Sequence, residues 1–246
     1  MGGFFGAVSQ RDVTLDIFFG VDYHSHLGTR RGGMIMFDEK DGFQRQIHNI
    51  ENTPFRTKFE RDLADFHGCS GIGCISDTDP QPLLVRSHLG LYAISTVGII
   101  NNADELIQTY FSDHGHQFMA MSSGRVNATE LAAALINQKD DLVSGILHAQ
   151  EMIQGSLTLL ILTERGEIIA ARDRLGRLPV LIGKNDEGQR LDRFVSKSVP
   201  LLPASLLQKY IRLKRIKING KRAERDTRLH LGDKVGGQAV LGKTKL

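Results

Sequence analysis

Two cysteines are the strongest nucleophiles in the sequence, and they lie only five residues apart. As a thiolate, either Cys69 or Cys74 could attack a carbonyl carbon or bind a metal. No further cysteine completes a metal site or a disulfide framework. Cys74 lies in the strand-like run GIGCIS, which favours a small core residue over a nucleophile. The two cysteines therefore predict a reduced compartment, and we expect a cytoplasmic protein.

Histidines occur in two short motifs, HSH at residues 24–26 and DHGH at residues 113–116. Protein zinc sites need three or four ligands, and no third ligand stands near either pair. Exposed or capping histidines are the better interpretation. The glycine-rich segment 68–73 precedes a strand instead of opening a helix, which argues against a phosphate-binding loop. We predict no metal and no cofactor.

The opening residues MGGFFGAV raise a third chemical possibility. A cysteine at position 2 would carry a thiol beside a free α-amino group once the initiator Met is removed. That amine, with a pKa of about 8, could act as the general base of the thiol. Gly2 has no side chain with which to do this.

The charge distribution divides the chain into an acidic and a basic part. Residues 1–187 contain 16 Lys and Arg against 24 Asp and Glu, a net charge of −8, whereas residues 188–246 contain 15 against 4, a net charge of +11. Such asymmetry indicates two units with different partners. The segment GKNDEGQ between them suits a linker. Apolar runs are too short for a membrane span, so no membrane association is expected.

The acidic part alternates strand-like and helix-like segments. By composition and flanking turns, strands are predicted at residues 4–8, 34–37, 71–76, 83–87, 91–96, 156–162, 167–172 and 179–183. By apolar spacing, helices are predicted at residues 102–111, 128–138 and 142–153, the second opened by a cap at Asn127. The turn between 156–162 and 167–172 is too short for a parallel crossover. We therefore expect antiparallel sheets with helices packed outside them.

Four segments resemble the glutaminase domain of glutamine phosphoribosyl-pyrophosphate amidotransferase, the first enzyme of purine synthesis. They are SHLGTRRGG (25–33), GIGCISDTDPQPLLVRS (71–87), STVGIINNADEL (95–106) and ARDRLGRLPVLIGK (171–184). The resemblance covers residues 1–184 and implies an α+β fold, the four-layer αββα sandwich of N-terminal-nucleophile enzymes, here truncated. The implied family activity is glutamine hydrolysis, with ammonia passed to a phosphoribosyltransferase domain. The RDRLGR segment would be scaffold, with Arg172 and Asp173 forming a structural ion pair.

The resemblance also assigns six pocket positions, and none keeps its chemistry except one glycine. The family's nucleophilic cysteine corresponds to Gly2, and the arginine of its HRG motif corresponds to Leu27. The arginine that binds the glutamine carboxylate corresponds to Ser76, and the aspartate that binds the α-amino group corresponds to Ala128. The asparagine and glycine of the oxyanion hole correspond to Val97 and Gly98. Loss of one oxyanion donor alone typically costs about 10²–10³ in rate. No catalytic residue is therefore expected.

From the resemblance we expect this sequence to lack the family's transferase half, and we expect the sandwich to lack the strands that follow residue 184 in the family. A separate phosphoribosyltransferase domain is one expected partner. Another chain could pair with unfilled sheet edges, since exposed edges favour association.

The basic part resembles an S4-type RNA-binding domain, most closely the version at the front of large pseudouridine synthases. The resemblance covers residues 189–235, after a linker at 185–188 and before a loose tail at 236–246. Leu206, Leu207, Tyr210 and Ile211 form an apolar stripe for its second helix, and Asn219-Gly220 is a hairpin turn signal. Cations predicted to contact RNA phosphates are Lys209, Arg212, Lys214, Arg215, Lys217, Lys221 and Arg222. A pseudouridine synthase catalytic domain is missing.

Three functions remain open from the sequence. The first is a non-hydrolytic scaffold or regulatory module of the amidotransferase family. The second is an RNA-binding protein that uses the basic part. The third is an enzyme that acts on a different ligand in the remodelled pocket.

Overall fold

The computed structural model describes residues 2–28, 30–114, 121–122, 125–178, 180–182, 190–198, 204–213, 216–218, 221–229 and 235–237. The chain divides into two compact units, Met1–Val180 and Leu181–Leu246. Each unit is described by itself.

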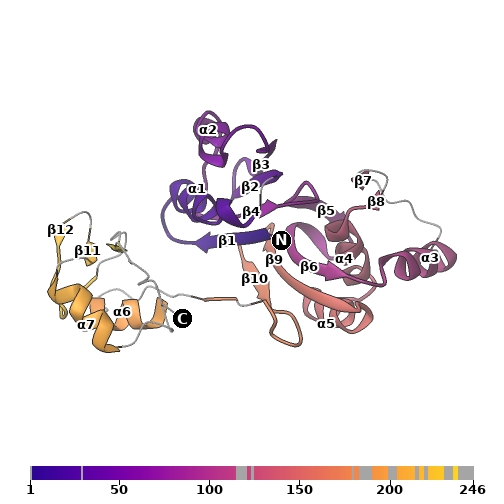
Figure 1. Cartoon of the computed structure of the whole chain (residues 1–246). Coiled ribbons are helices and arrows are strands. Elements are labelled where there is room, and N and C mark those ends of the chain that lie inside the picture. The colour runs from indigo at the N-terminus through magenta and orange to yellow at the C-terminus, as the bar shows by residue number, and fades with distance from the viewer. Residues whose placement is uncertain are drawn as a thin grey trace. The chain divides into compact units, whose positions relative to one another are not determined.

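The first unit contains two four-stranded antiparallel sheets (Figure 1). The first sheet has the order β1 (Gly2–Val8), β4 (Ser70–Ser76), β2 (Arg31–Asp38), β3 (Gly42–Asn49). The second has the order β10 (Ile168–Ala171), β9 (Gly155–Thr163), β6 (Gly90–Ile100), β5 (Leu83–Ser87). The antiparallel arrangement predicted from the short turn between β9 and β10 is confirmed. A short pair, β7 (Met121–Ser122) and β8 (Arg125–Val126), stands apart from both sheets.

Helices cover the outer face of each sheet, which gives the predicted αββα sandwich (Figure 1). The helical segments are α1 (Thr14–Tyr23), η1 (Ser25–Leu27), α2 (Phe55–Phe59), η2 (Leu63–Asp65), α3 (Ala103–His114), α4 (Ala128–Ile136) and α5 (Leu142–Met152). One apolar core joins α1 and α2 to the first sheet, and another joins α4 and α5 to the second. A third core, which includes Ile35, Ile72 and Leu160, lies between the two sheets. Asn127 caps α4 as predicted, because its Oδ1 accepts the N–H of Thr129 at 2.8 Å.

The second unit packs two helices with a three-stranded sheet. Its elements are α6 (Leu191–Ser198), α7 (Ala204–Arg212), β11 (Ile216–Ile218), β12 (Lys221–Arg222) and β13 (Val235–Gly237). The apolar core joins Leu207 and Ile211 of α7 to Leu191, Ile216 and Leu229. The predicted apolar stripe of the second helix is confirmed at these two positions.

Several elements differ from the prediction. The strand predicted at 179–183 is wrong for residues 180–182, because these have no partner strand and Leu181 and Ile182 are exposed. Strand β13 includes Gly236 and Gly237, which the prediction placed in the tail. The linker at 185–188, the turn at Asn219-Gly220 and the tail from residue 238 lie outside the described residues. Among the described helices, none is long and apolar enough to cross a membrane.

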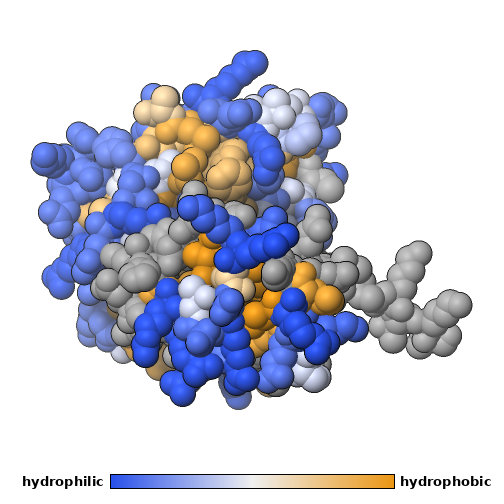
Figure 2. All heavy atoms as spheres, turned by 90° about the vertical axis from the view of Figure 1, so that its left-hand side faces the viewer, coloured by the Kyte–Doolittle hydropathy of each residue, from blue (hydrophilic) through white to orange (hydrophobic). Residues whose placement is uncertain are grey.

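The surface drawn in Figure 2 is mostly hydrophilic, with apolar side chains in patches between. In the first unit, α1 exposes Leu15, Phe19 and Tyr23, spaced four residues apart along one side. The guanidinium of Arg56 lies 5.6 Å from the ring centre of Phe19 and covers part of this stripe. Scattered exposed apolar residues are normal for globular proteins.

Candidate functional site

The predicted pocket positions on the first sheet lie beside each other at one end of the sandwich. Gly2 on β1 pairs with Ser76 on β4, and Ser76 pairs on its other side with Arg31 of β2. Side chains alternate between the faces of a strand. A Cβ on Gly6 would meet Ile168 and Leu160 of the second sheet, so Gly2, four residues earlier, faces the same way. Gly2 and Ser76 therefore belong to the space between the sheets.

Gly2 has no room for a side chain. A Cβ atom built on it would lie 2.4 Å from the carbonyl oxygen of Ile75, a backbone atom that cannot move without displacing β4. At Gly98 on β6, a Cβ would lie 2.0 Å from the carbonyl oxygen of Ser156. The structure thus tolerates only glycine, with this backbone, at both positions.

Ser76 is buried and is used to hold the loop that follows it. Its hydroxyl oxygen accepts the N–H of Thr78 at 3.2 Å and of Asp79 at 3.1 Å. The Asp79 carboxylate in turn accepts the N–H of Ala128 at 3.2 Å. Two pocket positions, Ser76 and Ala128, are therefore joined through one loop, and neither carries a charge for an amino-acid ligand.

A buried glutamine, which the sequence analysis did not single out, connects this loop to the second sheet. The Gln81 amide nitrogen donates to the carbonyl of Thr96 at 2.9 Å, and its oxygen accepts the N–H of Thr96 at 2.7 Å. The same oxygen accepts the hydroxyl of Thr129 at 3.0 Å. Gln81 is only 4% exposed, and Cys74 donates its thiol to the Gln81 carbonyl at 3.3 Å. This neutral network fixes β6 just before Val97 and Gly98.

The remaining pocket positions are more open. Val97 is half-buried and Gly98 is exposed on β6. Leu27 of η1 is 38% exposed and lies against Gly3, where a Cβ would be 3.0 Å from its methyl group. Since Gly3 faces the side opposite to Gly2, Leu27 does not meet Gly2 across the strand. Gly2 pairs with Ser76 across β1 and β4, and the loop after Ser76 contacts Ala128 through Asp79. Val97 and Gly98 follow Thr96, which the hydrogen bonds of Gln81 hold in place.

Neither cysteine has the environment of a nucleophile at the predicted pocket. Cys74 is 1% exposed, as predicted for a core residue, and burial raises the pKa of its thiol to about 12. At neutral pH the thiol is therefore protonated, and a thiol is a far weaker nucleophile than a thiolate. Cys69 is exposed, but it precedes β4 at the end opposite to Ser76.

The histidines 24 and 26 act as caps, as predicted. The Nδ1 of His24 is 2.7 Å from the carbonyl oxygen of Gly20, and the Nδ1 of His26 is 2.8 Å from that of Tyr23. In both cases the ring N–H donates to a helix carbonyl. The side chains of residues 113–116 lie outside the described part of the chain.

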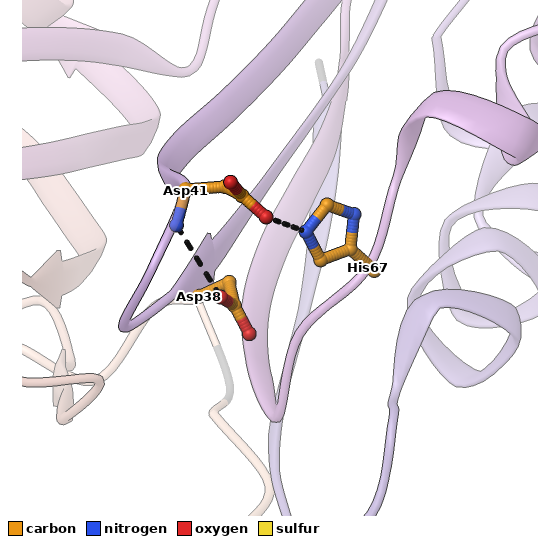
Figure 3. Close-up of side chains that lie close together, drawn as sticks. All are labelled: Asp38, Asp41 and His67. Atoms are coloured by element: carbon orange, nitrogen blue, oxygen red, sulfur yellow. Dashed lines mark hydrogen bonds and ion pairs between the residues drawn. The ribbon is translucent and has the colours of Figure 1, made fainter.

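The structure also gathers Asp38, Asp41 and His67, which spacing in the sequence could not predict (Figure 3). His67 Nε2 lies 2.7 Å from a carboxylate oxygen of Asp41, and Asp38 Oδ1 accepts the N–H of Lys40 at 2.9 Å. The hydrogen bond from Lys40 lowers the pKa of Asp38. These groups can present one ligand atom each to a cation. Asp38 and Asp41 also belong to the turn between β2 and β3, and His67 is held beside it by Asp41 and by Gln44, whose Oε1 accepts the N–H of His67 at 2.8 Å.

The predicted ion pair between Arg172 and Asp173 is wrong, because the partner of Asp173 is Arg177, at 3.2 Å. The turn at Gly176 returns Arg177 toward Asp173, whereas Arg172 is exposed. Burial alone would raise the pKa of Asp173, but hydrogen bonds from the side chain and backbone of Arg177 outweigh it and hold the pKa below its ordinary value. This pair lines a cavity of about 350 Å³, to which none of the six pocket positions contributes.

In the second unit, exposed cations lie along α7 and the adjoining strands. Of the predicted RNA contacts, Lys209, Arg212, Lys217, Lys221 and Arg222 are exposed, and Lys214 and Arg215 lie outside the described residues. Asp192 holds Arg190 and Arg225 in ion pairs of 2.9 and 2.8 Å. Burial works to raise the pKa of Asp192, but hydrogen bonds from Arg225 and Arg190 lower it further than burial raises it.

Comparison with known proteins gives matches for both units. The profile described as "Glutamine amidotransferase domain" matches residues 71–203, and the S4 domain profile matches residues 189–235. An amidophosphoribosyltransferase of Methanocaldococcus jannaschii is 28% identical over 198 residues, which cover 76% of this chain and 40% of the relative. The ribosomal large subunit pseudouridine synthase C of Buchnera aphidicola is 44% identical over 54 residues, 22% of this chain and 17% of the relative.

Among solved structures, the glutamine phosphoribosylpyrophosphate amidotransferase of B. subtilis, complexed with ADP and GMP, superposes with a TM-score of 0.64 at 26% identity. The match covers 75% of this chain and 40% of that one. The chain thus spans about two fifths of the length of the amidophosphoribosyltransferases that it matches. Both resemblances predicted from the sequence are confirmed.

Proposed function

The chain belongs to the family of glutamine amidotransferase domains, and we propose that its own domain is a non-hydrolytic scaffold or regulatory module. The observation that carries the proposal is the environment of Gly2. No thiol stands at the position of the family's nucleophile, and the Ile75 carbonyl occupies the space that a Cβ would need. Without a nucleophile no covalent acyl intermediate can form.

The groups available to a substrate support the same proposal. A free amino acid carries a carboxylate and an ammonium group, and burying either without an opposite charge is costly. Ser76 and Ala128 stand where the family has an arginine and an aspartate. Arg31 offers one guanidinium on the neighbouring strand, and the carboxylate nearest position 128, that of Asp79, already accepts the N–H of Ala128 at 3.2 Å. The hydrogen bonds of Gln81 hold the second sheet in place, but they join neutral groups and offer no charge to an amino-acid substrate.

The test is release of glutamate and ammonia from glutamine by the purified full chain, with an active amidophosphoribosyltransferase as the positive control. We expect no hydrolysis above the rate in buffer. Hydrolysis that a thiol-reactive glutamine analogue abolishes would overturn the proposal. A partner phosphoribosyltransferase, if supplied separately, should be changed in its ammonia-dependent rate or in its oligomeric state.

A second function, RNA binding by residues 189–235, is favoured by a separate observation. Among the described residues, the side chains of Lys209, Arg212 and Arg222 have no hydrogen bond or ion pair. Unpaired cations on one surface suit a polyanion, because each phosphate contact releases counterions.

Salt dependence of RNA affinity tests this function. We expect the logarithm of the affinity of the full chain to fall linearly with the logarithm of salt concentration. Replacing Lys209, Arg212 and Arg222 by Gln should reduce the slope by about 0.7–0.9 for each phosphate that is no longer neutralised. The control replaces three exposed cations of the first unit, Lys139, Arg86 and Arg165, by Gln. An equal effect of both triple variants would contradict an RNA surface on the second unit.

A further inference from the structure

A cavity of about 610 Å³ opens in the second unit between α7 and residues 222–225. Its volume falls within the range of roughly 300–1,000 Å³ that is typical for small-molecule sites. Lys209, Arg212 and Arg222, which have no partner among the described residues, all contribute to its lining. The surface is therefore hollowed where the charge is concentrated.

The cations that line the cavity divide into one that is engaged and three that are available. Arg225 donates to Asp192 at 2.8 Å and is held in that ion pair. The other three have no partner among the residues that the structure describes. Like charges gathered on one surface favour an anion between them. One phosphodiester group could contact two of the three.

The rest of the lining is unlike a surface that only contacts phosphates. Ile211 and Ala223 are 6% and 8% exposed and give the cavity an apolar floor. The amide of Gln208 can donate and accept hydrogen bonds, and the carboxylate of Glu224 can accept from an exocyclic amine. Seven of the nine lining residues are polar or charged and two are apolar, so the cavity offers hydrogen-bonding groups to the edge of a base and an apolar contact to its face.

We propose that this cavity receives one unpaired nucleotide of RNA, with its phosphate on the cations and its base against Ile211 and Ala223. The inference rests on the proposed RNA binding and specifies its substrate. In a continuous A-form duplex the bases are stacked, and their edges in the deep groove are out of reach of side chains. An unpaired nucleotide in a bulge or loop can be turned outward. The cavity therefore selects RNA by an extruded base.

The experiment compares two RNA hairpins that differ by a single unpaired nucleotide in the stem, bound by the full chain at one salt concentration. We expect the bulged hairpin to bind about tenfold more tightly, the scale of one bidentate side-chain contact to a base edge. Equal affinity, with steep salt dependence for both, would overturn the inference while leaving RNA binding in place. Absence of binding to either hairpin would contradict RNA binding itself.

Two variants locate the effect. Gln208→Ala changes an exposed residue of the cavity and should abolish the preference for the bulge while leaving affinity for the plain hairpin. Lys217→Ala on β11 lies outside the cavity lining and should weaken both RNAs by the same factor. A preference that survives Gln208→Ala would overturn the assignment of the nucleotide to this cavity.

Discussion

At the scale of the residue, Gly2 is both the predicted position of the family's nucleophile and a position where packing leaves no room for a side chain. We expect Gly2→Ala to destabilise the protein by about 1–3 kcal/mol, the usual cost of inserting a methyl group into a packed site. The reason is the distance of 2.4 Å between the new Cβ and the Ile75 carbonyl oxygen, which only a shift of β1 or β4 can increase. The measurement is the urea midpoint at unchanged m-value.

The neighbouring glycine supplies a matched control for this prediction. At Gly3 the nearest atoms to a new Cβ belong to the side chains of Leu27 and His24, at 3.0 and 3.1 Å, and these can rotate away. Gly3→Ala should therefore cost less than Gly2→Ala. Equal costs at the two positions would show that the Ile75 carbonyl does not restrict position 2.

At the scale of the element, most of the sandwich could be predicted from composition and apolar spacing. β4, β6 and β9 are apolar over most of their length because they are central strands, and such runs are distinctive. β3 was not predicted, because GFQRQIHN is a polar edge strand with little alternation. The segment 180–182 is apolar like a central strand, so a strand is predicted there. It pairs with nothing among the described residues.

The residues of the candidate site are brought together by strand pairing and turns, and their spacing along the sequence does not predict these contacts. Gly2 and Ser76 are partners across two strands, and the prediction that they share one pocket rests on the resemblance to a family. The partner of Asp173 was missed because a turn brings Arg177 back, while Arg172 is adjacent only in sequence. The cavity of the second unit joins Gln208 on a helix to Glu224 beyond the next hairpin strand, and no local pattern links such residues.

At the scale of the whole molecule, the two units have separate apolar cores that share no residue. A ligand that binds only the folded form of one unit stabilises that unit by mass action. At a free RNA concentration of 100 times Kd the stabilisation is about 2.7 kcal/mol. The amides of one unit can report this separately from those of the other, because hydrogen exchange measures local opening.

We therefore expect bulged RNA to slow hydrogen exchange in α7 and β11, and to leave exchange in β6 and β9 unchanged. The basis is that the cavity, and the three cations of its lining that have no partner among the described residues, belong to the second unit, whereas β6 and β9 belong to the first. In the variant with Lys209, Arg212 and Arg222 replaced by Gln, the same RNA concentration should not slow hydrogen exchange in α7 or β11. Equal slowing in β6 and β9 would contradict independent units, and would indicate that RNA binding is coupled to the amidotransferase-like fold.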